Sequence, residues 1–96
     1  MTDNGPLEAI RRRFLVRLAE QRAELARLSW DFGKNRETQD IVHKIAGIAG
    51  SLGFPELSEA ASGVEMLLVQ ESTANLRACH QFQTLMSRIE AVLDGT

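Results

Sequence analysis

The chain has 96 residues, of which 44% are hydrophobic and 25% are charged, a composition typical of one folded domain and too apolar for disorder. Its net charge of −2 gives no global electrostatic reason to expect nucleic-acid binding. The single cysteine, Cys79, excludes an internal disulfide, and no apolar run is long enough to span a membrane. We therefore expect one cytoplasmic domain over residues 1–96.

A first helix is predicted over residues 6–30. Pro6 suits a first helical turn. Gly33 is expected to end this helix, and Asn35 is expected to cap the next one. Arg11, Arg12 and Arg13 point to three successive faces, which indicates a solvated surface rather than one basic stripe. The residues expected in the core are Leu7, Ile10, Phe14, Leu18, Leu25 and Leu28.

Two further helices, over residues 36–52 and 55–69, are separated by a short turn. Gly53 is expected to end the second helix, and Pro55 to begin the third. The apolar stripe predicted for the second helix is Ile41, Ile45, Ile48 and Leu52, and that for the third is Leu57, Ala61, Val64 and Leu68.

A fourth helix is predicted over residues 73–94, with Ser72 or Thr73 as its cap. Its inward residues are expected to be Leu76, Cys79, Phe82, Met86, Ile89 and Leu93, with Met66 of the third helix also in the core. Four amphipathic helices with short connections predict an all-α, antiparallel up-down-up-down four-helix bundle, and we expect it to be a monomer.

His43 lies on the outer face of the second predicted helix, roughly 160–200° from its apolar stripe at about 100° per residue. Gly47 and Gly50 fall within about 40° of it, and Ala46 borders the same face. Each mid-helix glycine costs about 1 kcal/mol against alanine. A surface free of side chains around a histidine indicates that a partner approaches closely.

The short turn also predicts which residues of the second and third helices lie level. Residues whose numbers add to about 108 face each other, so His43 is expected beside Glu65. From that position the carboxylate can accept a hydrogen bond from Nδ1–H. The imidazole would then present Nε2 as an exposed, neutral nucleophile.

The segment from Ile41 to Glu65 resembles the histidine-containing phosphotransfer (HPt) domains, whose pattern is roughly His-x-Leu-Lys-Gly-Ser-Ala-x-x-Leu-Gly. His43 occupies the phosphoacceptor position, Ile45 stands for the leucine, and Gly47 for the first glycine. The other matching positions are Ala49, Leu52-Gly53, Leu57 and Val64-Glu65. The match covers about a quarter of the chain.

The resemblance implies a phosphorelay intermediate without kinase activity of its own. His43 would accept a phosphoryl group and exchange it with the aspartate of a response-regulator receiver domain, with a sensor or hybrid histidine kinase as the other partner. It implies no cofactor in this chain, since the receiver supplies the magnesium. Glu65 would orient His43. The residues expected to contact the partner are Arg36, Gln39, Ala46, Gly47, Gly50 and Phe54.

One position departs from the family pattern, because Ala46 stands where the usual lysine would help to neutralise the phosphoryl group. Lys44, about 100° around the helix, is a possible charge stabiliser through its flexible stem. The departure leaves open an adaptor that binds a receiver without transfer.

Three other readings fit less well. A histidine-kinase dimerisation hairpin usually has an acidic residue and a nearby proline after its histidine, and both are absent after His43. A purely structural bundle leaves the glycine face unexplained. A metal site lacks a second ligand at helical spacing.

Overall fold

The structure is a computed structural model that describes residues 6–95, and within that range it is helical with no strand. The four helices are α1 (Pro6–Leu28), α2 (Asn35–Ser51), α3 (Pro55–Gln70) and α4 (His80–Asp94). Two short 3₁₀ turns, η1 (Phe32–Lys34) and η2 (Leu76–Ala78), precede α2 and α4. The prediction of an all-helical domain with four helices is confirmed.

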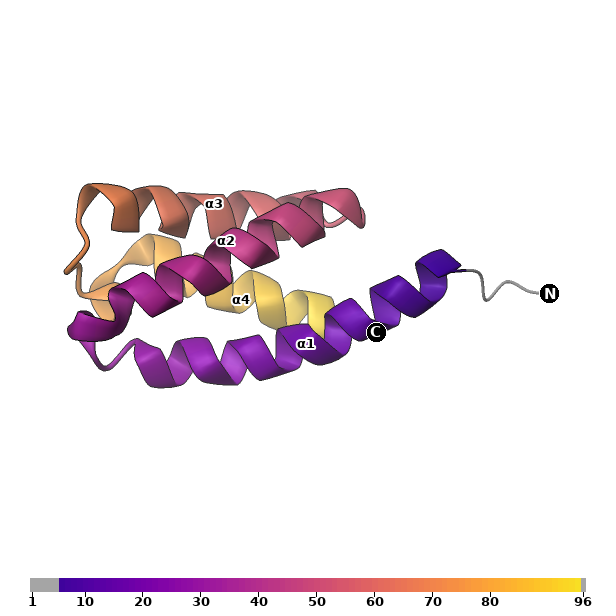
Figure 1. The fold of residues 1–96 in the computed structure, drawn as a ribbon, viewed down its shortest axis with the longest axis horizontal. Helices are drawn as coiled ribbons and strands as arrows, with labels where there is room; N and C mark the ends of the chain where they lie inside the picture. The colour runs from indigo at the N-terminus through magenta and orange to yellow at the C-terminus, as the bar shows by residue number, and fades with distance from the viewer. Residues whose placement is uncertain (1–5, 96) are drawn as a thin grey trace.

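The four helices pack side by side into an elongated body of 49 × 20 × 19 Å. Figure 1 shows successive helices running in opposite directions along the long axis, with the N-terminal turns of α1 extending beyond the other helices. None of the helices in residues 6–95 is both long enough and apolar enough to cross a membrane.

The overhang of α1 explains why part of its predicted core stripe is wrong. Leu7 and Ile10 are exposed, whereas the remaining members, from Phe14 to Leu28, are buried. The first turns of α1 project past the ends of the other helices (Figure 1), so Leu7 and Ile10 have too few neighbours to be buried. The core-forming part of α1 therefore begins at Phe14.

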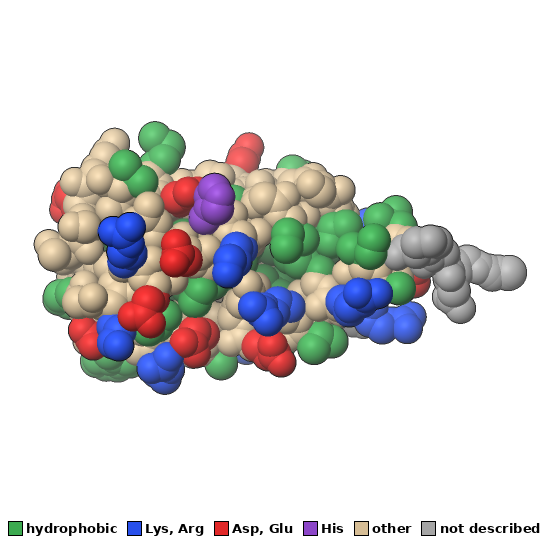
Figure 2. Space-filling model, in the orientation of Figure 1, with side chains coloured by type: hydrophobic (Ala, Val, Ile, Leu, Met, Phe, Trp, Pro, Cys, Tyr) green, Lys and Arg blue, Asp and Glu red, His purple; other side chains and the backbone are tan. Residues whose placement is uncertain are grey.

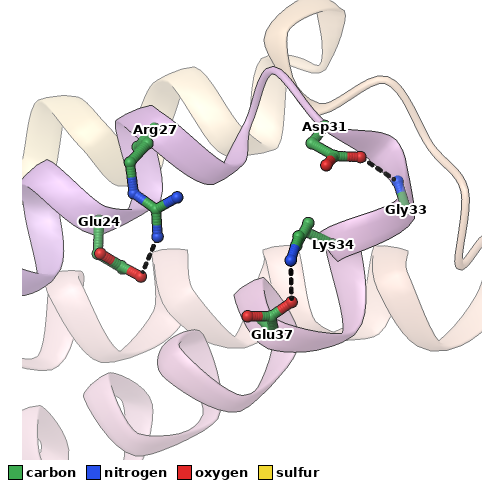
Figure 3. Close-up of polar contacts among 6 residues, drawn as sticks. All are labelled: Glu24, Arg27, Asp31, Gly33, Lys34 and Glu37. Atoms are coloured by element: carbon green, nitrogen blue, oxygen red, sulfur yellow. Dashed lines mark hydrogen bonds and ion pairs between the residues drawn. The ribbon is translucent and has the colours of Figure 1, made fainter.

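The α1–α2 link is held by short polar contacts (Figure 3). Asp31 accepts a hydrogen bond from the backbone N–H of Gly33 at 3.0 Å, which caps η1. Ion pairs join Glu24 to Arg27 and Lys34 to Glu37 on either side of the link. Because these groups are exposed, each pair contributes at most about 1 kcal/mol.

Asn35 does not cap α2 as predicted, since it is the first residue of the helix and has a buried side chain. Its Nδ2 donates to the backbone carbonyl of Ala74 at 2.8 Å, across to the link between α3 and α4. Its Oδ1 has no protein partner within the described residues. This single buried bond joins both links at one end of the bundle.

The face that α2 buries is rotated from the predicted stripe. Val42 and Ala49 are fully buried with Ile45 and Leu52, while Ile41 is half-buried and Ile48 is 47% exposed. The prediction chose the largest side chains, but the small side chain of Ala49 lets α2 pack closely in the core. Ile48 therefore lies outside the core, on the side of α2 next to α1.

The α2–α3 turn follows the prediction. Gly53 has φ +88°, a left-handed conformation that a glycine adopts without a steric penalty, and Phe54 N–H donates to the Ala49 carbonyl at 2.9 Å. Pro55 then begins α3. The predicted inward residues of α3 (Leu57, Ala61, Val64 and Leu68) are all buried.

The fourth helix begins at His80, so its predicted start at residue 73 is wrong, as is a cap at Ser72 or Thr73. The chain first crosses the end of the bundle through η2, where buried Leu76 faces the core. Cys79 and Met86 are only partly buried, and Leu85 takes an inward place that was not predicted. Met66 is exposed rather than in the core, since it lies on the side of α3 opposite Val64.

Candidate functional site

The candidate site is built around His43, the middle residue of the 17-residue helix α2. Its neighbour Val42 is fully buried, which fixes the rotation of the helix and turns the imidazole outward. The His43 side chain is 72% exposed. A reactive group here is held by a rigid helix and is open to a partner.

Glu65 of α3 lies beside His43, as the register of the hairpin predicts. The distance from His43 Nδ1 to Glu65 Oε2 is 2.7 Å. The Glu65 side chain is only 26% exposed, and the preceding residue, Val64, is fully buried and anchors its position. An ionised carboxylate only accepts hydrogen bonds, so the pair places the hydrogen on Nδ1 and leaves Nε2 with a free lone pair when the ring is neutral.

The two glycines of the exposed face differ in their surroundings. A Cβ built on Gly47 meets nothing within 4 Å, so no packing within the domain requires a glycine there. A Cβ on Gly50 would lie 3.2 Å from Ser58 Oγ, which itself donates to the Ala46 carbonyl at 2.8 Å. Gly50 therefore has a packing role at the α2–α3 contact, whereas Gly47 has none.

Lys44 is exposed on the side of α2 that faces α1. It lines a groove between these helices together with Arg13 and Arg17. Among residues 6–95, no polar contact joins Lys44 to His43 or Glu65. Lys44 follows His43 in the sequence, but its side chain makes no polar contact with the His43–Glu65 pair.

Arg36 and Gln39 lie toward the N-terminal end of α2, where they line a shallow hollow of about 300 Å³ with Ser72 and Thr73. Arg36 is exposed and has no ion pair among the described residues. Ala46, at the position of the family lysine, is partly buried against the core.

A comparison with known families decides what kind of domain carries this site. The sequence model of the Hpt domain family matches residues 9–92, which include all four helices except the ends of α1 and α4. The chain belongs to the Hpt domain family. This confirms the resemblance noted for the segment around His43. Comparison with curated proteins and with solved structures gave no match.

Hpt domains carry out histidine phosphotransfer in two-component signalling, where they work with receiver and kinase partners. A site of this kind needs an accessible histidine on a firm support. The Hpt domain described above has such a group in His43. Within residues 6–95, no group of three or more His, Cys, Asp or Glu side chains is arranged to hold a metal ion.

Phe54, expected to contact a partner, also packs within this Hpt domain. Its ring stacks on Phe14 of α1, with the centroids 5.6 Å apart and an interplanar angle of 24°. The Arg11 guanidinium lies 5.5 Å from the Phe54 centroid, and Arg11 Nη2 donates to the Leu52 carbonyl at 2.9 Å. Arg11 thus joins α1 to the turn after α2.

Sequence reasoning missed this role of Arg11, which it placed with Arg12 and Arg13 on a solvated surface. Arg11 contacts Leu52 and Phe54, which lie more than 40 positions later in the chain, so no local sequence pattern indicates these contacts. The only signal in the sequence was the carbonyl groups left free at the end of a helix, which cationic side chains often satisfy.

Proposed function

We propose that this Hpt domain is a phosphorelay intermediate in which His43 is the phosphoacceptor. The observation that carries the proposal is the pair formed by exposed His43 and Glu65, with 2.7 Å between Nδ1 and Oε2. The pair leaves Nε2 directed away from the carboxylate on an accessible helix face. The proposed partner is a receiver domain that carries a phosphoaspartate.

The proposed step is a displacement at phosphorus. The Nε2 lone pair of neutral His43 attacks the phosphoryl group, a P–N bond forms, and the P–O bond to the aspartate breaks, which releases the aspartate as a carboxylate. The ring then carries a positive charge that Glu65 stabilises through Nδ1–H. The magnesium ion that neutralises the phosphoryl oxygens is expected on the receiver, and this chain contributes position rather than a metal.

The surface next to His43 supports the close approach that such a step requires. Gly47 lies one helical turn from His43 and offers no side chain, and nothing within the domain occupies the space above it. A receiver would bring its phosphoaspartate to Nε2 over this position. Transfer needs reacting atoms about 3–3.5 Å apart, so even a small side chain on this face would matter.

The experiment is a transfer assay with a panel of receiver domains that carry labelled phosphoaspartate. We expect label on the wild-type chain that is lost in acid, and no label on His43→Gln. The matched control is His80→Gln, which removes the other histidine, also exposed but at the start of α4. Transfer to His43→Gln at the wild-type rate would refute the assignment.

A second candidate function is an adaptor that binds a receiver without transfer. The position of Lys44 in the α1–α2 groove favours it, because Ala46 supplies no cation on the face of His43. The same panel separates the two functions. Receiver binding that His43→Gln leaves unchanged, with no label on the wild type, would support the adaptor.

A further inference from the structure

The Lys and Arg side chains of the domain differ in whether they have a partner, either a carboxylate or an aromatic ring. Five of the eleven Lys and Arg side chains form ion pairs with carboxylates: Arg12 with Glu8, Arg22 with Glu90, Arg27 with Glu24, Lys34 with Glu37 and Arg88 with Glu56. Two more lie over aromatic rings, Arg11 on Phe54 and Arg77 on Trp30. Four have neither kind of partner among residues 6–95.

Three of these four cations, Arg13, Arg17 and Lys44, line one groove between α1 and α2. The α1–α2 groove has a volume of about 370 Å³ and no acidic residue in its lining. Figure 2 shows hydrophobic side chains beside Lys and Arg side chains on this face. The residues that complete the lining are Ile10, Phe14, Gln21, Ile45 and Ile48.

The apolar part of the groove is exposed at both edges. Ile10 of α1 is 48% exposed and Ile48 of α2 is 47% exposed. An apolar surface with a charged rim is the usual composition of a protein-docking site. Lys44 also follows His43 directly in α2, so the groove begins beside the reactive histidine and one partner can cover both.

We propose that the α1–α2 groove docks the receiver through an apolar segment flanked by aspartate or glutamate side chains. This inference rests on the proposed function and names the surface that selects its partner. Arg13, Arg17 and Lys44 attract the acidic rim of that segment, while Ile10 and Ile48 contact its apolar side. Lys44 then acts in docking and not as a stabiliser of the phosphoryl charge.

Charge complementarity favours a protein over nucleic acid as the occupant. Farther along the same two helices, Glu20 and Glu24 join Arg17 and Lys44 in lining the adjacent hollow. A phosphate backbone that follows the helices would meet these carboxylates, whereas a short acidic segment would end before them. The domain as a whole is also negative, at −2.

Rim charges mainly act on the rate of association and on its dependence on salt. The test therefore measures phosphoryl transfer from labelled receiver as a function of receiver concentration, at low and at high ionic strength. Arg13→Glu and Lys44→Glu are each expected to raise the apparent KM about three- to tenfold at low salt. The effect should shrink at high salt, and the rate at saturating receiver should stay within about twofold of wild type.

The charge change at Arg13 and the apolar change at Ile48 each have a matched control in the chain. Arg12→Glu makes the same change of charge one residue away, but Arg12 does not line the groove, so its KM should stay within about twofold of wild type. For the apolar part, Ile48→Ser should weaken docking while Val16→Ser should not, because Val16 is also exposed (60%) but lies outside the groove. Circular dichroism confirms that each variant is folded.

The outcomes separate this inference from the proposed function. Phosphoramidate, a small donor that needs no docking surface, should label His43 equally in wild type, in Arg13→Glu and in Ile48→Ser. Equal KM values for Arg13→Glu and Arg12→Glu, with transfer to wild type intact, would overturn the groove and leave the relay standing. If no receiver labels the wild type, the dissociation constant of the receiver replaces KM, and absence of any binding overturns both.

Two further results would reassign the groove. A fall in the saturated rate of Lys44→Glu with an unchanged KM would mean that Lys44 acts on the phosphoryl group, against the proposal. Binding of a labelled DNA duplex that Arg13→Glu abolishes, with receiver docking unaffected, would make the groove a nucleic-acid site.

Discussion

Replacing Gly47 with alanine is expected to stabilise the domain and to impair phosphotransfer at the same time. The opposite signs follow from the surroundings of Gly47. A methyl group there meets no atom within 4 Å, so the substitution adds no strain within the domain. The only surface that it can obstruct is that of a partner.

The stability gain can be estimated from helix propensity alone. An exposed glycine inside a helix is less favourable than alanine by about 0.8–1.0 kcal/mol. For a domain of this size, about 1 kcal/mol corresponds to a rise in Tm of about 4–8 °C. Overpacking a close interface costs about 1–3 kcal/mol, so transfer from a receiver should slow about fivefold or more.

Two measurements on the same sample test this expectation: thermal unfolding by circular dichroism and the transfer rate from a labelled receiver. Gly63→Ala is the matched control, because a Cβ on Gly63 of α3 also meets nothing within 4 Å. Gly63 and Glu65 lie on different sides of α3, since they flank the buried Val64. It should raise Tm and leave transfer unchanged. A Gly47→Ala variant that transfers as fast as the control would refute the close-approach reasoning.

Glu65→Gln should shift the His43 tautomers toward Nε2–H by about fivefold, since a partly exposed, charge-assisted hydrogen bond contributes about 1 kcal/mol; unchanged imidazole ¹⁵N shifts would contradict this. Arg11→Ala should lower the free energy of unfolding by about 1–2 kcal/mol, because the Leu52 carbonyl loses its donor, and denaturant titration measures it. Asn35→Asp should lower the free energy of unfolding by about 2 kcal/mol or more, and by more than Asn35→Ala does, because a buried carboxylate cannot donate a hydrogen bond to the Ala74 carbonyl. Equal midpoints for the two Asn35 variants would count against that bond.

The sequence predicted the α2–α3 hairpin well because its signals are local. Gly53 and Pro55 define a turn with almost no freedom, and a turn this short fixes the register of the two helices. The contact between His43 and Glu65, 22 positions apart, follows from that register. The apolar face of α3 is regular, so its burial could be predicted without knowing its neighbours.

Other features depend on contacts that a periodic pattern does not encode. Ile48 and Ala49 are both apolar, and which of them is buried depends on how closely the neighbouring helices approach. The start of α4 at His80 reflects the distance that the chain must cross after α3, since Ser72 and Thr73 are both acceptable caps. Side-chain roles such as that of Arg11 emerge only when the helices are assembled.

The position of His43 at the middle of α2 has an electrostatic consequence. The partial charges of a helix are concentrated at its ends, and their influence on a side chain falls off within the first or last turn. His43 is two turns from either end of α2, so the helix neither attracts nor repels a phosphoryl group bound there. A phosphohistidine at this site would receive its charge compensation from the partner, and an intermediate that its own domain holds weakly is one that it can readily pass on.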